Sequence, residues 1–215
     1  MTEPLRIDIV SDVVCPWCAV GYYQLQQALA AEGIAADIHW HPFELNSQMG
    51  PEGQDIVEHV AEKYGSTPEE SKRARERLTA AGAEAGFTFH YADDMRIWNT
   101  FRAHRLLHWA EDHGKVHDLK LALFRAYFTD GKAVDDAEVL ADLAADVGLD
   151  RDAALAVVTG DAFTDEVRAL QHFWLSKGIR GVPAMVFDSK HLVTGARGAD
   201  VYAQFLRQLQ ETRKV

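Results

Sequence analysis

Cysteine is scarce in this chain of 215 residues: there are two, Cys15 and Cys18, separated by two residues. A scaffold held by several disulfides is therefore excluded. The chain also lacks an apolar run of about 18 residues, which a membrane span needs, and its start lacks the basic and apolar stretches of a secretion signal. We therefore expect a cytoplasmic protein. Because reducing conditions there make structural disulfides rare, we expect the cysteine pair to be catalytic or metal-binding.

Basic residues are also in the minority. The chain has 22 Lys and Arg against 33 Asp and Glu, which gives a formal net charge of −11. An acidic surface repels phosphate backbones and anionic headgroups, so neither nucleic acid nor a membrane is an expected partner. Apolar residues make up 47% of the chain, enough for a globular core. The composition leaves a homodimer open.

The two cysteines lie between an expected strand and an expected helix. Apolar residues alternate over 5–10, which predicts a strand, and recur at helical spacing over 19–31. The segment 34–43 predicts a second strand after Gly33, a residue that often ends a helix. The chain should therefore begin as a β-α-β unit with two parallel strands.

The middle of the chain is dominated by helical patterns. These predict helices at 55–64, from Thr67 to about 85, and at 99–113, 116–127, 135–147, 151–158 and 161–177. Strand patterns return at 184–187 and 192–194. A last helix follows at 200–211, with Val201, Phe205, Leu206 and Leu209 facing inward. The two ends should together form a small mixed sheet flanked by helices, interrupted by a helical insertion.

The position of Cys15 at the start of a helix favours its thiolate, because free backbone N–H groups and the helix dipole stabilise negative charge there. Cys18 lies one turn further in and should be more enclosed. We expect Cys15 to be the nucleophile and Cys18 to resolve the mixed disulfide. Pro16 suits a first helical turn. Trp17 offers a flat apolar surface beside the sulfur to a protein or small thiol substrate.

Two alternatives to redox chemistry remain open. His39 and His41 lie on one face of the expected second strand, so they and the two cysteines have the ligand types of a Cys₂His₂ zinc site. A chain with a large core does not need a metal to fold, so we predict no metal. The other alternative is that the two thiols simply fill space.

Five segments resemble the DsbA-like thioredoxin-fold oxidoreductases of the FrnE type: 11–18, 42–46, 99–106, 123–128 and 178–183. The resemblance covers essentially the whole chain in the right order. It implies an α/β, thioredoxin-like fold with a large inserted helical domain. The implied divisions are an N-terminal part at 1–46, the insertion at 47–178 and a C-terminal part at 179–215. The sequence departs from the commoner family pattern at Arg197, where glutamine is more frequent.

The resemblance also implies further site residues. Pro183 would be a cis-proline opposite the cysteine pair, a form that X–Pro bonds reach at small cost. The backbone of Val182 would then be exposed for strand-like pairing with a substrate. Asn99, Thr100 and His104 match a segment that approaches the active site from the inserted helices. His104 would either donate a hydrogen bond near the sulfur or serve a buried or capping function.

Related enzymes with similar inserted helices include the kappa-class glutathione transferases and the hydroxychromene carboxylate isomerases, which use glutathione and carry serine at the first cysteine position. Retention of Cys15 and Cys18 favours dithiol exchange, by which the protein would act on thiol- or disulfide-containing substrates. A glutathione-dependent isomerase or transferase is the alternative, with glutathione as a co-substrate and no other cofactor. A chaperone-like groove around Trp17 is the non-enzymatic alternative.

Overall fold

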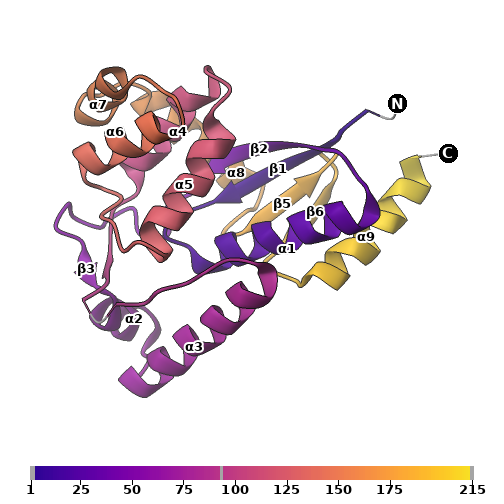
Figure 1. Ribbon diagram of the computed structural model, residues 1–215, viewed down its shortest axis with the longest axis horizontal. Coiled ribbons are helices and arrows are strands. Elements are labelled where there is room, and N and C mark those ends of the chain that lie inside the picture. Colours follow the sequence, from indigo (N-terminus) through magenta and orange to yellow (C-terminus); the bar gives the residue numbers. More distant parts are fainter. Residues whose placement is uncertain (1–2, 93, 214–215) are drawn as a thin grey trace.

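A four-stranded mixed sheet forms the centre of the protein in a computed structural model that describes residues 3–92 and 94–213 (Figure 1). The strands run in the order β2-β1-β5-β6. The parallel pair consists of β1 (Leu5–Ser11) and β2 (Ala36–Pro42); β5 (Ala184–Phe187) is antiparallel to β1, and β6 (His191–Thr194) is antiparallel to β5. The predicted mixed sheet and its β-α-β start are therefore confirmed.

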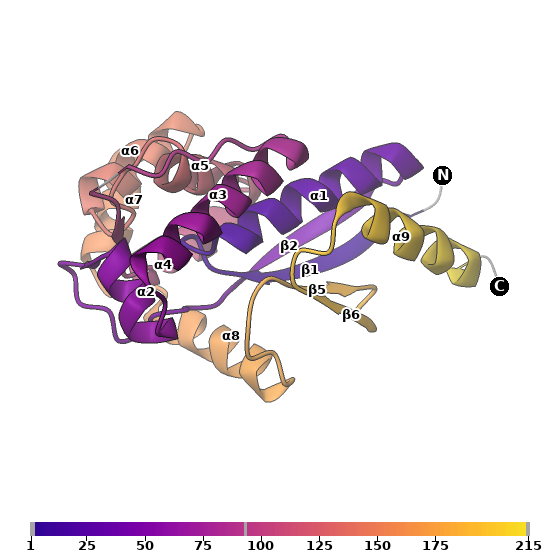
Figure 2. The same ribbon diagram turned by 90° about the horizontal axis from the view of Figure 1, so that it is seen from below.

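Helices cover both faces of this sheet (Figure 2). α1 (Pro16–Glu32) packs beside α9 (Ala199–Arg213) on one face, and α8 (Thr164–Ser176) packs on the other, against β2. Because successive strand side chains point to opposite faces, Ile9 of β1 joins the core with Leu25 of α1. Its neighbour Val10 packs with Trp174 of α8.

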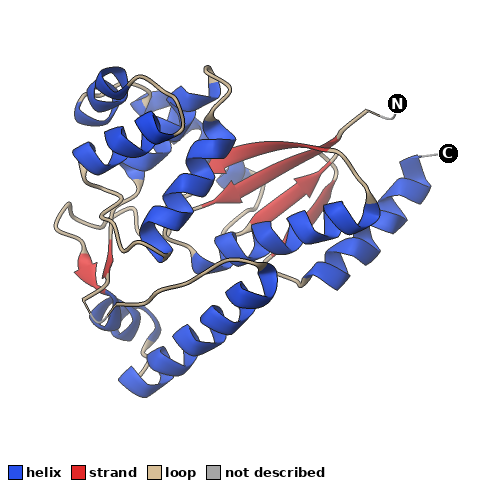
Figure 3. Cartoon of the chain, in the orientation of Figure 1, coloured by secondary structure: helices blue, strands red, loops and turns tan. Residues whose placement is uncertain are grey.

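The chain between β2 and β5 is largely helical (Figure 3). Its helices are α2 (Ile56–Tyr64), α3 (Pro68–Ala85), α4 (Phe101–Glu111), α5 (Val116–Phe128), α6 (Ala137–Asp146), α7 (Arg151–Thr159) and then α8. The Thr67 side chain accepts from the Glu70 backbone, and the Glu70 carboxylate accepts from Thr67, a capping box that starts α3. The domain limits at 46/47 and 178/179 stay predictions.

α1 begins at Pro16, which confirms the prediction that Cys15 stands at the start of this helix with Pro16 in its first turn. Two other local features differ from the sequence-based expectation. The short strands β3 (Gln54–Asp55) and β4 (Arg96–Ile97) form an antiparallel pair that no alternation could reveal, since each has only two residues. α8 begins at Thr164, three residues after the predicted start.

The inward face of α9 was predicted wrongly at one position. Val201 is 50% exposed, whereas its neighbour Tyr202 is fully buried. The buried stripe therefore runs through Tyr202, Leu206 and Leu209, at spacings of four and three that place them on one side of a helix. Phe205 is partly buried beside it. The larger ring takes the core position that the sequence pattern gave to valine.

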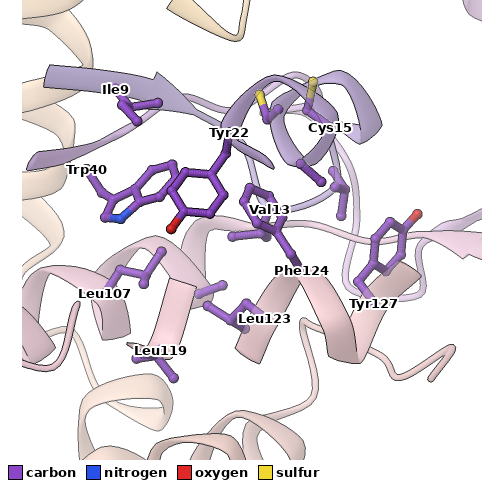
Figure 4. Close-up of a cluster of buried hydrophobic side chains, with 14 of the residues drawn as sticks. Ile9, Val13, Cys15, Tyr22, Trp40, Leu107, Leu119, Leu123, Phe124 and Tyr127 are labelled. Carbon is purple, nitrogen blue, oxygen red and sulfur yellow. The ribbon is translucent and has the colours of Figure 1, made fainter. Parts of the chain in front are cut away.

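A neutral histidine joins α5 to the sheet and to α1. Trp40 Nε1 donates to His117 Nδ1 at 3.2 Å, and Tyr22 Oη lies 2.9 Å from His117 Nε2. Because an indole N–H can only donate, His117 Nδ1 must be unprotonated. Burial lowers the pKa of His117, which agrees with this neutral form. Tyr22 and Trp40 lie side by side above Leu119 and Leu123 in the core (Figure 4).

Gly82 of α3 lies where a side chain has no room. A Cβ atom there would fall 2.4 Å from Phe89 Cδ2 and 2.9 Å from the Phe87 carbonyl oxygen. Alanine would favour the helix by about 1 kcal/mol, but overpacking costs about 1–3 kcal/mol. Because three contacts would be shorter than 3.0 Å, we place the overpacking cost at about 2–3 kcal/mol and expect Gly82→Ala to lower the free energy of unfolding by about 1–2 kcal/mol in urea denaturation.

Gly181 provides the matched control, since a Cβ atom there meets nothing within 4 Å. Gly181→Ala should leave the free energy of unfolding unchanged within about 0.5 kcal/mol. A Gly82→Ala variant at least as stable as the wild type would show that α3 is not packed this closely against the following loop.

Candidate active site

Cys15 is the N-cap residue of α1, with extended backbone angles (φ −90°, ψ 109°) and no side-chain capping bond. Its carbonyl accepts from the Cys18 backbone at 3.0 Å, which closes the first turn around both cysteines. The two are free thiols; Cys15 is 4% exposed and Cys18 is fully buried. Trp17 is 44% exposed beside them. The expected enclosure of Cys18 and exposure of Trp17 are confirmed, while their chemical roles stay predictions.

The loop before β5 meets this first turn. The Cys15 thiol donates to the Val182 carbonyl oxygen over 3.8 Å. The Val182–Pro183 peptide bond is cis, as predicted. Pro183 also contacts α1 where Gly21 has no side chain: a Cβ atom at Gly21 would lie 3.3 Å from Pro183 Cγ. The fold thus places Val182, from the C-terminal part of the chain, next to the sulfur atom of Cys15, from the N-terminal part.

The buried carboxylate of Asp12 supports the loop that follows β1. Asp12 is fully buried, and its Oδ2 accepts from the Leu45 backbone N–H at 2.7 Å. His104 Nε2 lies 3.3 Å from Asp12 Oδ1 and donates to the Phe43 carbonyl at 2.9 Å. Burial acts to raise the pKa of Asp12, but His104, the Leu45 N–H and Thr100 together hold it below its usual range.

Asn99, Thr100 and His104 take supporting positions. Asn99 Nδ2 donates to the Met49 carbonyl at 2.9 Å, and its Oδ1 accepts from the Phe101 backbone at the start of α4. Thr100 is 3% exposed and helps to lower the Asp12 pKa. The contacts of His104 are with Asp12 and Phe43, so of its two expected functions the structure shows the buried one. Substrate contact by these three residues stays a prediction.

The side chains of the alternative zinc site, His39, His41 and the two cysteines, are not grouped around one point. His41 Nε2 donates to Asp8 Oδ1, and His39 Nε2 to Asp37 Oδ2, each over 2.8 Å. Within residues 3–92 and 94–213, no three His, Cys, Asp or Glu side chains are grouped so that they could hold a metal ion. The two histidines therefore pair with carboxylates along the sheet.

A cavity of about 370 Å³ opens beside Cys15. Its walls come from the start of α1, from α2 and α3, from the segment before α4 and from the end of α5. Ile56, Val60, Leu78, Met95 and Ile97 form much of its apolar surface. The sequence did not predict this cavity, because its walls are far apart along the chain.

Lys120 of α5 is a functional candidate that the sequence reasoning missed. It is 1% exposed, and its Nζ lies 4.9 Å from the Phe124 ring centre and 5.3 Å from that of Trp40. Burial lowers its pKa to about 8, against the opposing charges of Cys18 and Asp12. Burial raises the pKa of the Cys18 thiol, and Lys120 counteracts that rise. The sequence did contain one indication of this residue, because Lys120 lies within the apolar stripe of the predicted helix 116–127.

Residues 6–209 match the DSBA-like thioredoxin domain. The chain belongs to this family. The α/β thioredoxin-like fold implied by the sequence is thereby confirmed. Within the described residues, no helix of this DSBA-like protein is both long and apolar enough to cross a membrane.

Individual relatives extend over nearly the whole chain. The probable DsbA oxidoreductase of Streptomyces coelicolor is 34% identical, with a TM-score of 0.88 over 95% of this chain and 89% of that one. The cytosolic disulfide reductase DsbM of Pseudomonas aeruginosa, solved with GSH, shares the fold at 16% identity (TM-score 0.66, 96% and 100% covered). An uncharacterized Bacillus subtilis protein, YwbO, is 23% identical over 97% of this chain and 99% of its own length.

Replacement of Asp12 tests the support of the site. Asp12→Asn removes the buried charge; its amide oxygen can keep the Leu45 N–H, but its NH₂ then faces the Nε2 of His104, so we expect the free energy of unfolding to fall by about 2–3 kcal/mol at pH 7. The folded-state pKa of Asp12 is lowered, so its stabilising contribution is present above the unfolded pKa of about 3.9 and is lost as pH falls through the folded value.

Urea unfolding at several pH values should therefore show a constant gap between wild type and variant near neutrality, narrowing only in acid. Asp37→Asn is the control, because the Asp37 side chain is 61% exposed and its pair with His39 should contribute less than about 0.5 kcal/mol. Equal effects of the two substitutions would contradict the importance of the buried carboxylate.

Proposed function

We propose that this protein is a cytoplasmic thiol-disulfide oxidoreductase of the FrnE type that works through the Cys15–Cys18 dithiol. The observation that carries the proposal is the position of the Cys15 sulfur. It lies at the N-terminal end of α1, contacts the Val182 carbonyl and borders the cavity. Free N–H groups and the helix dipole at that end stabilise a thiolate, the reactive form in disulfide exchange.

The exchange proceeds in two displacements. The Cys15 thiolate attacks one sulfur of a substrate disulfide, and the other substrate sulfur leaves as a thiolate that takes up a proton. Cys18 then loses its proton and attacks the Cys15 sulfur, which releases the second substrate thiol. The substrate gains two electrons and the protein ends with a Cys15–Cys18 disulfide. The reverse sequence oxidises a substrate dithiol.

The neighbouring residues would position the substrate. Trp17 and Pro16 border the cavity beside Cys15, and Val182 lies across from them. An extended substrate would pair with the Val182 backbone, while cis-Pro183 fixes the course of that loop. The retention of both cysteines supports dithiol exchange over glutathione-dependent isomerisation, with glutathione remaining an alternative co-substrate.

Single cysteine variants test this assignment. Cys15→Ser should lower insulin reduction by about 100-fold or more, because the nucleophile is lost. Cys18→Ser should still react once but retain the substrate as a mixed disulfide on Cys15, detectable by mass spectrometry after acid quenching. Equal activity of wild type and Cys15→Ser would refute the oxidoreductase assignment. Glutathione-dependent isomerisation that survives in Cys15→Ser would instead favour the isomerase alternative.

A further inference from the structure

The cavity beside Cys15 has the size and lining of a small-molecule site. Its volume of about 370 Å³ lies within the range of roughly 300–1,000 Å³ for ligand pockets. Cys15, Val182 and Tyr127 of α5 all line it. Figure 4 shows Cys15 and Tyr127 at the same end of the buried cluster. A ligand in this cavity would therefore lie next to the reactive sulfur.

The charges in the cavity wall are of one sign. Its described lining includes Lys63 of α2, Arg75 of α3 and His59, but no Asp or Glu, although the whole chain carries a net charge of −11. A wall that carries positive charge and no carboxylate favours an anionic occupant.

The two cations are not committed to carboxylates. Lys63 Nζ donates to the Leu45 carbonyl at 2.7 Å, and Arg75 Nη1 donates to Ser71 Oγ at 3.0 Å. Neither forms an ion pair within residues 3–92 and 94–213, in contrast to Arg151, which pairs with two carboxylates. Burial lowers the pKa of Lys63, but Asp12 and Cys15 oppose that shift, so its ammonium lies within electrostatic reach of the site.

Tyr91 adds a hydrogen-bond donor to the same wall. Its hydroxyl oxygen is buried and has no hydrogen-bond partner among the described residues. Burial raises the pKa of Tyr91, so the hydroxyl keeps its proton at neutral pH. The Arg75 charge opposes that rise, which places the guanidinium and the phenol within electrostatic reach of each other. A buried hydroxyl without a partner is costly unless a ligand completes it.

The remaining wall excludes a strongly polar occupant. A peptide segment or glutathione would bring several amide groups against the apolar side chains of Ile56, Leu78 and Met95. Each unpaired amide costs about 1–3 kcal/mol when it loses water without a new partner. An aromatic or branched apolar body with a single anionic end avoids that cost.

We infer that the substrate is a low-molecular-weight disulfide, or the corresponding thiol, with an aromatic or branched apolar body and a carboxylate. Lys63 and Arg75 bind the carboxylate, Tyr91 donates to it, and the sulfur faces Cys15. This inference rests on the proposed exchange function. One symmetric disulfide and the protein dithiol yield two substrate thiols and the Cys15–Cys18 disulfide, so electrons and protons balance without another reactant.

Reaction rates with matched disulfides test the inference. Dithiobis(nitrobenzoate) is aromatic and anionic, dithiodipyridine is aromatic and uncharged, and oxidised glutathione is anionic but polar. We expect the Lys63→Gln and Arg75→Gln double variant to lose about 10-fold more rate with dithiobis(nitrobenzoate) than with dithiodipyridine, each relative to wild type. The uncharged disulfide reports any effect that the lost positive charges have on the Cys15 thiolate itself, because Lys63 lies within electrostatic reach of Cys15.

The matched control removes two exposed cations that do not line the cavity, by Lys72→Gln and Arg77→Gln on α3. This control changes the net charge equally and should alter neither rate by more than about 2-fold. A double variant that slows all three disulfides equally, or a control that slows as much, overturns the inference. The inference is also overturned if the double variant is slower than wild type with oxidised glutathione but not with dithiobis(nitrobenzoate).

A second measurement does not depend on exchange. Nitrobenzoate, which has no disulfide, should protect Cys15 of the wild type from iodoacetamide, and uncharged nitrobenzamide should protect it less. The cavity double variant should lose the protection by nitrobenzoate. If protection is seen but Cys15→Ser and wild type react equally with every disulfide, the proposed function fails while the anion site stands. Absence of selective protection overturns the site itself.

Discussion

The burial of one carboxylate, that of Asp12, fixes the geometry on which the active site depends. Asp12 directly follows β1, and its backbone carbonyl accepts from the Cys15 N–H at 3.3 Å. Its side chain binds the Leu45 N–H and lies beside His104 of α4. A fully buried charge is stable only where such donors surround it. The carboxylate thus ties together the start of α1, the loop after β2 and the inserted helices.

The cavity depends on the same arrangement. The first turn of α1 and the loop before β5 belong to the part of the fold built around the sheet, whereas most of the cavity wall comes from α2, α3 and α5. The reactive sulfur is therefore positioned by the part of the fold built around the sheet. The shape and charge of the cavity beside it depend mostly on the inserted helices. For the proposed exchange function, changes in α2 and α3 would alter the choice of substrate while leaving the cysteine pair in place.

Local sequence signals account for what could be predicted, and tertiary packing accounts for what could not. The cysteine pair, the Thr67 cap and the cis-proline each depend on a few adjacent residues or on a family motif, and the structure agrees with their placement. Lys63, Arg75 and Tyr91 line one cavity only because segments distant in sequence pack together. On the inward face of α9, Tyr202 is buried where the sequence pattern predicted Val201. Helical periodicity alone does not specify this packing.

The contact between the Cys15 thiol and the Val182 carbonyl has a consequence for the order of events. A thiol can donate to that oxygen, but a thiolate has no proton to donate and is repelled by it. In the proposed exchange, ionisation of Cys15 would therefore release the carbonyl at the moment the sulfur becomes nucleophilic. In the reduced protein, the thiol contacts the same backbone acceptor with which a substrate is proposed to pair. Activation of the nucleophile and opening of the proposed docking position would then be a single step.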